Sequence, residues 1–195
     1  MARPKEFDRD EALDRALDVF WTKGFDATSV QDLVEATGVQ RQSLYDTFGD
    51  KGSLYLAALD RYSERSEEWA RALERPAESP LTVLRQTFIQ IAHDASTGSR
   101  GCLLVHAAQE RAGAEPAVRD CVQAGIQRLE RAFTTLVKHA QAAGEISSQI
   151  DARGAARTLV TLLWGFRAMT RGRAGEAWLR SVVDSVVGLL STETS

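Results

Sequence analysis

The stretch that decides the fold runs from Thr28 to Lys51 and reads TSVQDLVEATGVQRQSLYDTFGDK. Its first part predicts a short helix that is capped by Thr28 or Ser29 and ended by Gly38, which tolerates the left-handed conformation of a tight turn. A second short helix is expected over residues 40–48, with apolar positions four apart on one face. Helix, glycine turn and helix together predict a helix-turn-helix, whose second helix enters the major groove of DNA.

The exposed face of the second helix consists of side chains that donate or accept hydrogen bonds. Arg and Gln can pair with guanine and adenine edges, whereas hydroxyls and Lys hold phosphate. Because other short amphipathic helix pairs share this spacing, the motif alone leaves open a purely structural pair. The candidate DNA-binding residues are Thr28, Ser29, Gln31, Gln40, Arg41, Gln42, Ser43, Tyr45, Thr47 and Lys51.

Residues 8–62 resemble the N-terminal domain of TetR/AcrR-family transcriptional regulators. The resemblance rests on the segments ALDVFWTKGFDATSV, DLVEATGV, SLYDTFGDK and SLYLAALDRY, which lie in register with that domain. It implies a helix-turn-helix domain over residues 1–52, a linking helix over residues 51–74 and a regulatory and dimerisation domain over residues 75–195. It also implies a homodimeric repressor of a near-palindromic double-stranded DNA operator.

Composition predicts an all-α fold, and the apolar periodicity and the breaks along the chain predict about nine helices. The chain has 195 residues, of which 44% are apolar and only four are proline. No window approaches the ~18 uninterrupted apolar residues of a membrane span, and the charged start MARPKEFDRDE lacks a signal-peptide core. We therefore expect a cytoplasmic protein without membrane contact. No phosphate loop, nucleophile elbow or metal-ligand spacing occurs, so we expect neither an enzyme nor a metal or other cofactor.

Charge argues mildly against nucleic acid, because the formal net charge is −3 and residues 1–52 hold eleven acidic but only seven basic side chains. For DNA binding, Arg41, Lys51 and the N-terminal Arg3 and Lys5 must converge on the duplex while the acids cap helices or face away. The acidic surplus therefore leaves open an alternative function. This is a helical sensing or protein-interaction module that no longer binds DNA.

A second resemblance covers residues 100–110, RGCLLVHAAQE. They look like the Arg-Gly-Cys-Leu motif of one branch of these regulators, in some of which the cysteine reacts with electrophiles or oxidants and releases DNA. Cys102 is expected in the first turn of a helix and beside Arg100, and both features favour a thiolate. The alternative is that Cys102 is a small buried hydrophobe. The branch usually has Asn where this chain has His106.

The family resemblance places an effector pocket between the fifth, sixth, seventh and eighth helices. An apolar pocket with a few polar groups suits a small hydrophobic or electrophilic effector. Most of the candidates also fit an ordinary core. They are Phe88, Ile91, Leu103, His106, Glu110, Phe133, Trp164 and Phe166.

The segment 151–171 predicts a helix with a seam of small residues and apolar side chains around most of its circumference. Such a helix is buried on more than one side. By resemblance, it and the following helix pair with their mates in a second copy as a four-helix bundle, and the alternative is ordinary intramolecular core. The candidate dimer residues are Thr158, Thr161, Leu162, Gly165, Met169, Trp178, Val182, Val183, Val186 and Leu190.

Overall fold

The computed structural model describes residues 7–98, 100–169, 172 and 174–191, and within them the chain forms nine α-helices and no β-strand. This confirms the predicted all-α fold. No helix in the described part of the chain has the length and apolarity that a membrane span requires. The helices are α1 (Arg9–Lys23), α2 (Val30–Thr37), α3 (Arg41–Phe48), α4 (Lys51–Glu74), α5 (Pro80–Thr97), α6 (Leu103–Glu110), α7 (Pro116–Ala142), α8 (Ala152–Met169) and α9 (Glu176–Leu190).

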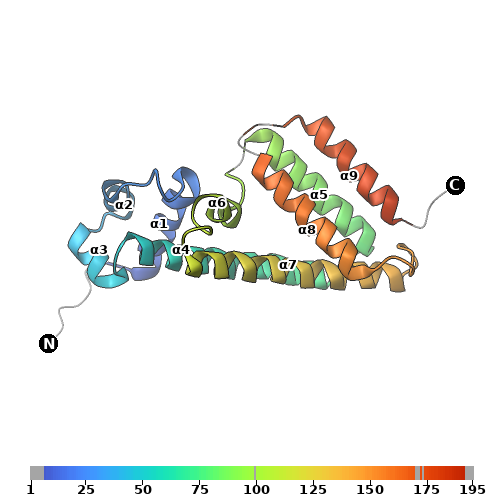
Figure 1. The fold of residues 1–195 in the computed structure, drawn as a ribbon, viewed down its shortest axis with the longest axis horizontal. Coiled ribbons are helices and arrows are strands. Elements are labelled where there is room, and N and C mark those ends of the chain that lie inside the picture. Colours follow the sequence, from blue (N-terminus) through green and yellow to red (C-terminus); the bar gives the residue numbers. More distant parts are fainter. Residues whose placement is uncertain (1–6, 99, 170–171, 173, 192–195) are drawn as a thin grey trace.

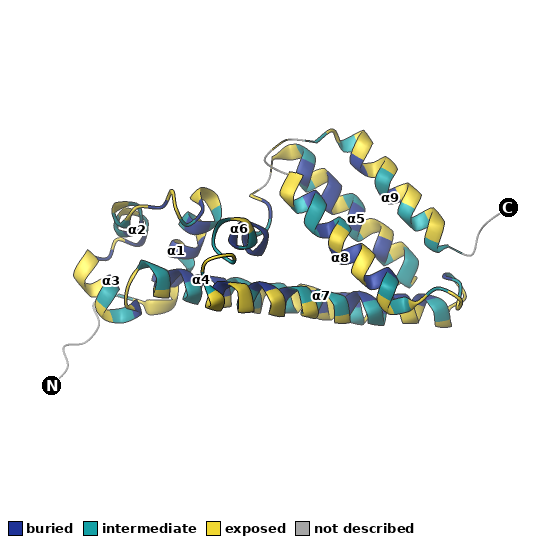
Figure 2. Cartoon of the chain, viewed as in Figure 1, coloured by how far each residue is buried: buried dark blue, intermediate teal, exposed yellow. Residues whose placement is uncertain are grey.

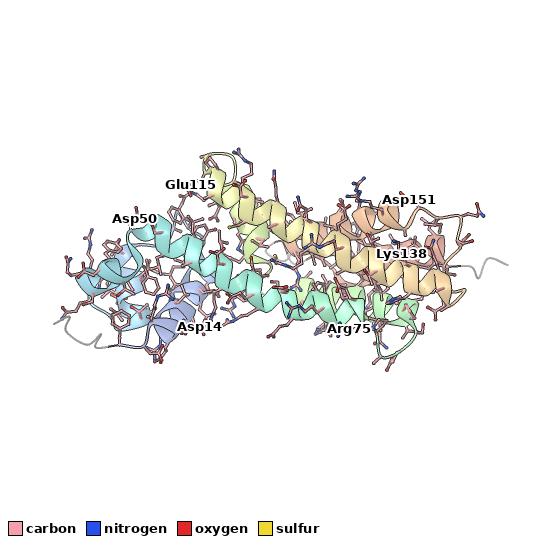
Figure 3. The ribbon with its side chains drawn as sticks, turned by 90° about the horizontal axis from the view of Figure 1, so that it is seen from below. Asp14, Asp50, Arg75, Glu115, Lys138 and Asp151 are labelled. Atoms are coloured by element: carbon pink, nitrogen blue, oxygen red, sulfur yellow. The ribbon has the colours of Figure 1, made fainter. Side chains whose placement is uncertain are left out.

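The molecule is elongated, with two helical groups at its ends. Figure 1 shows α1, α2 and α3 at one end, α5, α8 and α9 at the other, and α6 between them. The long helices α4 and α7 extend along both groups. Figure 3 shows them side by side and running in the same direction, with Asp50 and Glu115 at their starts and Arg75 and Lys138 toward their ends. A change in the packing of α4 against α7 can therefore reach both ends of the molecule.

The N-terminal helix boundaries follow from side-chain caps. Asp8 caps α1 by accepting hydrogen bonds from the backbone N–H groups of the first turn, and Asp50 caps α4 in the same way. At α2 the structure selects Ser29 as the cap, in a reciprocal capping box with Asp32. Gly38 ends α2 in the left-handed conformation, with a φ of 70°.

One boundary in the C-terminal half differs from expectation. The helix α5 continues to Thr97 and ends at Gly98, which adopts the left-handed conformation with a φ of 76°. The next helix begins at Leu103, so Cys102 is its N-cap rather than part of its first turn. The backbone of Cys102 is extended, with φ −117° and ψ 125°.

The hydrophobic core has two parts. One part lies under α1–α4 and is completed by residues from α6 and the start of α7, among them Leu103, Leu104 and Val118. The other part joins α5, α7, α8 and α9. The predicted domain limits at residues 52 and 75 remain a prediction. Since α6 is built into the core of the N-terminal helices, movement of α6 must disturb that core.

Candidate functional site

The turn between α2 and α3 is fixed by buried groups. The Thr37 hydroxyl donates to the Leu33 carbonyl at 2.7 Å and accepts from the Val39 backbone N–H at 3.2 Å. Leu44 and Phe48, four residues apart, turn the inner face of α3 into the core. The orientation of α3 is therefore set by packing, and its opposite face points outward.

The outward face of α3 carries the polar side chains that the sequence predicts. Figure 2 shows α3 exposed at the end of the molecule. The Arg41 guanidinium lies 5.5 Å from the centre of the Tyr45 ring, and the Gln42 amide donates to Asp46 Oδ1 at 2.9 Å. The exposed members are Gln40, Arg41, Gln42 and Ser43, and the partly exposed members are Tyr45 and Thr47.

The candidates beside α3 have different environments. Thr28 is only 1% exposed and its hydroxyl donates to the Gly24 carbonyl at 2.5 Å, so it is a buried structural residue and its assignment to the DNA-facing surface is corrected. Ser29 is exposed but caps α2, and Gln31 is exposed and donates to Glu35.

The Lys51 ammonium lies 4.3 Å from the centre of the Phe25 ring, at the start of α4. Arg3 and Lys5 lie outside the described residues.

The acidic surplus of residues 1–52 is largely committed to structure. Asp8, Asp32 and Asp50 cap helices, and Asp32 also pairs with Lys23 at 2.7 Å. Three further acids pair with cations that lie beyond residue 52. These ion pairs are Asp14 with Arg61 and Arg65, Asp18 with Arg100, and Asp26 with Arg111. Formal charge counted by sequence segment therefore overstates the negative character of the N-terminal helices.

A cavity of about 250 Å³ lies in the middle of the molecule, where α1, α4, α6, α7 and α8 meet. It is lined mainly by aromatic and apolar side chains, together with three arginines. Its lining comprises Trp21, Tyr62, Arg65, Ser66, Trp69, Cys102, Leu104, Gly125, Arg128, Leu129, Leu163, Trp164 and Arg167.

Of the eight predicted effector-binding residues, only Trp164 lines this cavity. Phe88, Phe133 and Phe166 instead pack on one another, with ring centres 5.8 Å apart for the first pair and 6.3 Å for Phe88 and Phe166. Ile91, Leu103 and His106 are buried at 4% exposure or less, and the carboxylate of Glu110 binds the backbone of Phe25. The apolar residues predicted to bind the effector therefore lie mostly in the hydrophobic core and not in the wall of the cavity.

The lining residues that sequence reasoning missed have a recognisable spacing. Tyr62, Arg65, Ser66 and Trp69 follow one another at intervals that place them on one face of α4. Arg128 lies on α7 beside this face. A helix face that mixes aromatic rings with arginines is a signal for a binding surface rather than for a solvated one.

Cys102 lies in the cavity wall. The Tyr62 hydroxyl donates to Cys102 Sγ at 3.2 Å. Burial, with a further contribution from Cys102, raises the pKa of Tyr62, so the phenol remains a protonated donor at neutral pH. Arg100 does not turn toward the thiol, because its guanidinium pairs with Asp18 at 2.6 Å and lies 4.3 Å from the centre of the Trp21 ring.

Cys102 and Cys121 are both free thiols. Burial raises the pKa of Cys121, and Asp60, whose Oδ1 lies 3.7 Å from its sulfur, raises it further. Within the described ranges, no group of three or more His, Cys, Asp or Glu side chains is placed to hold a metal ion.

An open groove of about 540 Å³ lies between α8 and α9 at the far end of the molecule. Eight of the ten predicted dimer residues line it, namely Thr158, Thr161, Leu162, Gly165, Met169, Trp178, Val182 and Val186. Val183 does not, because it is 1% exposed and lies one turn after the buried Leu179 on the inner face of α9. Leu190 is half-buried against the core, whereas Leu189, which was not predicted, is 81% exposed.

A helix-turn-helix with a fixed, outward-facing second helix, followed by further helices that help to enclose a central cavity, defines a DNA-binding regulator. Residues 12–58 match the family of bacterial regulatory proteins called tetR, and residues 77–183 match the tetracyclin repressor-like C-terminal domain. The chain belongs to the TetR family of transcriptional regulators.

Similar proteins cover most of the chain. The transcriptional repressor ComR of Escherichia coli is 30% identical over 190 residues, which cover 96% of this chain and 90% of ComR. The uncharacterized regulator YezE of Bacillus subtilis is 34% identical over 155 residues, covering 76% of this chain and 78% of YezE. A cysteine mutant of the regulator CifR, complexed with a 26-base-pair operator, matches with a TM-score of 0.82 and 29% identity, covering 97% of this chain and 100% of CifR.

Proposed function

We propose that this chain is a homodimeric repressor that binds a near-palindromic DNA operator through two copies of α3. A small-molecule effector in the cavity, or modification of Cys102, releases it. The outward polar face of α3 is the observation that carries the proposal. In this proposal Arg41 and Gln42 read base edges, while Tyr45, Thr47 and Lys51 hold phosphates; their exposure or partial exposure on and beside α3 supports these roles.

The α8–α9 groove supports dimerisation. Trp178 is 55% exposed and Met169 is 40% exposed, and both border this groove. Large apolar side chains gathered on one surface mark a protein–protein contact. A two-fold axis through the groove would place the α8 and α9 pair of one copy against the same pair of the other. The two copies of α3 would then meet half-sites roughly one DNA turn apart.

Release of DNA requires that the cavity and the helix-turn-helix be coupled. The α6 helix contributes Cys102 and Leu104 to the cavity region, and the residues at its ends bind the α1 region. At its start the Gly101 carbonyl accepts from the Trp21 indole at 3.2 Å, and at its end Glu110 accepts from Phe25 at 2.8 Å. A coupling free energy of ~1–3 kcal/mol between two such sites changes affinity 5- to 150-fold.

The alternative is a helical sensing module that no longer binds DNA. Its support was the acidic surplus of the N-terminal helices, and the ion pairs with Arg61, Arg65, Arg100 and Arg111 remove much of that support. The family membership also favours a cytoplasmic regulator over an enzyme.

The deciding experiment is fluorescence anisotropy with DNA from immediately upstream of the protein's own gene. It compares the wild type with Cys102→Ser, each with and without a mild oxidant. Tight, salt-sensitive binding that the oxidant abolishes only in the wild type supports a thiol-switched repressor. Tight binding that is indifferent to oxidant supports a reversible effector, and failure of both this DNA and a random-sequence selection supports the alternative.

A further inference from the structure

We infer that the central cavity takes a small aromatic organic anion, with its carboxylate bound by Arg128 and its ring enclosed by Trp21, Tyr62 and Trp164. The inference rests on the proposed function, because it gives the chemical class of the effector. The cavity, its arginines and its rings carry the argument.

The side chains that line the cavity include basic residues but no acidic residue. Arg65, Arg128 and Arg167 approach the cavity from α4, α7 and α8. Arg65 pairs with Asp14 at 2.7 Å, and Arg167 lies 3.9 Å from Asp94, so two of these cations have a carboxylate outside the lining. Arg128 is the remaining cation of the lining, so the cavity holds one guanidinium without a described ion-pair partner inside a largely apolar wall.

Arg128 differs from the other two arginines. Its Nη1 donates to the Ser63 carbonyl at 3.3 Å, and none of the described carboxylates forms an ion pair with it. A guanidinium has five N–H donors in a planar fork that matches the two oxygens of a carboxylate. A half-buried fork with a single long backbone contact is well suited to a bidentate anion entering from the cavity.

The rings supply the second half of the recognition. Trp21 and Tyr62 pack edge to face, with ring centres 5.0 Å apart, and Trp164 approaches from α8. A volume of about 250 Å³ is small for a ligand site, since pockets for drug-sized ligands measure roughly 300–1,000 Å³. A ligand with a single ring or two fused rings and one charged group fits this space better than an elongated drug or lipid.

Aromatic walls alone would also suit a cation, through attraction to the faces of the rings. The guanidinium of Arg128 opposes that occupant, because two like charges in a largely apolar cavity repel each other strongly. A neutral aromatic ligand would leave Arg128 desolvated without an anion. The charges of the lining residues therefore favour an anionic ligand over a cationic or a neutral one.

The test is isothermal titration calorimetry of the full chain, without DNA, using three matched probes. These are 2-naphthoate, the neutral 2-naphthamide and the cationic 2-naphthylmethylamine. We expect 2-naphthoate to bind at least roughly tenfold more tightly than the amide, as a charge-assisted hydrogen bond requires. We expect the amine to bind least well.

Variants locate the site. Arg128→Gln should abolish the preference for the carboxylate, and Arg128→Lys should retain part of it. Arg71→Gln is the matched control, because Arg71 is an exposed cation of α4 that pairs with Glu67 and lies outside the cavity lining. Circular dichroism establishes that each variant is folded, and the three-probe comparison in the wild type decides the charge preference even if Arg128→Gln unfolds.

Equal binding of acid and amide, preference for the amine, binding of none of the probes, or a carboxylate preference that survives in folded Arg128→Gln would each overturn the inference. Because no DNA is present, these outcomes are independent of the operator experiment. A protein that binds its operator but not 2-naphthoate keeps the proposed function and loses this effector class. A protein that binds 2-naphthoate but no operator keeps the ligand class inferred here and loses the proposed function.

Discussion

The carboxylate of Glu110, the last residue of α6, accepts a hydrogen bond of 2.8 Å from the backbone N–H of Phe25, in the loop between α1 and α2. The Phe25 ring lies against the Lys51 ammonium, whose nitrogen is 4.3 Å from the ring centre. Gly24, with a φ of 82°, leaves room for this contact, because a Cβ there would overlap the Glu110 carboxylate. The end of α6 is thus linked, through one loop residue, to Lys51, a cation beside the proposed DNA-binding surface.

Replacing Glu110 tests this link. Glu110→Ala removes the acceptor for the Phe25 N–H and should lower the free energy of unfolding by about 1–3 kcal/mol. Amide hydrogen exchange at Phe25 should become faster, and urea denaturation measures the stability. Glu110→Gln is the matched control, because its amide oxygen can still accept the bond. Unchanged exchange at Phe25 in Glu110→Ala would show that the contact does not restrain the loop.

Arg41 tests the DNA-facing surface. Arg41→Ala should weaken operator binding by about 1–3 kcal/mol or relax its sequence preference at one base pair, because a bidentate base contact is lost. Anisotropy titrations against the operator and single-base variants measure both effects. Arg71→Ala removes the same charge from an exposed position far from α3 and should leave binding unchanged. If Arg41→Ala also leaves affinity and specificity unchanged, Arg41 lies outside the interface.

Local signals made much of the fold predictable. Ser29, Gly38 and Asp50 mark helix ends because the chemistry of a cap involves only neighbouring residues. The cap at α2 was ambiguous in sequence, since the Thr28 hydroxyl could have capped the helix. Its bond to the Gly24 carbonyl depends on how the preceding loop folds back, which the sequence pattern does not specify.

The cavity was not predictable in the same way. Tyr62 and Cys102 are forty residues apart in sequence, and their contact depends on the angles at which α4 and α6 pack. Periodicity identifies which face of a helix is buried, but not where the packing of several helices leaves a space. Phe88, Phe133 and Phe166 were predicted to line the effector pocket and lie in the hydrophobic core of the structure, because core and pocket residues share the same apolar pattern.

Asp32 predicts a pH dependence of stability. Its pKa is lowered from 3.8 to about 2, first by the hydrogen bond from Lys23 and then by the backbone N–H of Ser29. Because the folded-state pKa is depressed, its stabilising contribution is complete above pH 3.8 and is lost as the pH falls toward 2. The melting temperature of Asp32→Asn should therefore lie below that of the wild type at neutral pH and approach it in acid.

Thermal melts across this range measure the effect of Asp32. Glu35→Gln removes an acid from the same helix that has an amide partner, Gln31, rather than a cation. Its melting temperature should differ little from that of the wild type at any pH. A constant difference between Asp32→Asn and the wild type from neutral pH to pH 2 would contradict the assigned ion pair.

Gly165 tests the α8–α9 groove. A Cβ at this position meets nothing within 4 Å inside the chain, so Gly165→Leu should leave the subunit folded. Leucine also favours a helix over glycine by roughly 1 kcal/mol, which makes loss of α8 an implausible outcome. The larger side chain would instead fill the groove and prevent close approach of a second copy. We expect light scattering to report a folded monomer.

Gly188→Leu is the matched control for Gly165→Leu. Gly188 is an exposed glycine in the last turn of α9, a Cβ there also meets nothing within 4 Å, and it does not line the groove. The same change in size and helix propensity should therefore leave the dimer intact. Dimers of equal stability in both variants would show that the groove is not the contact between copies, whereas dissociation of Gly165→Leu alone would place the two-fold axis along α8 and α9.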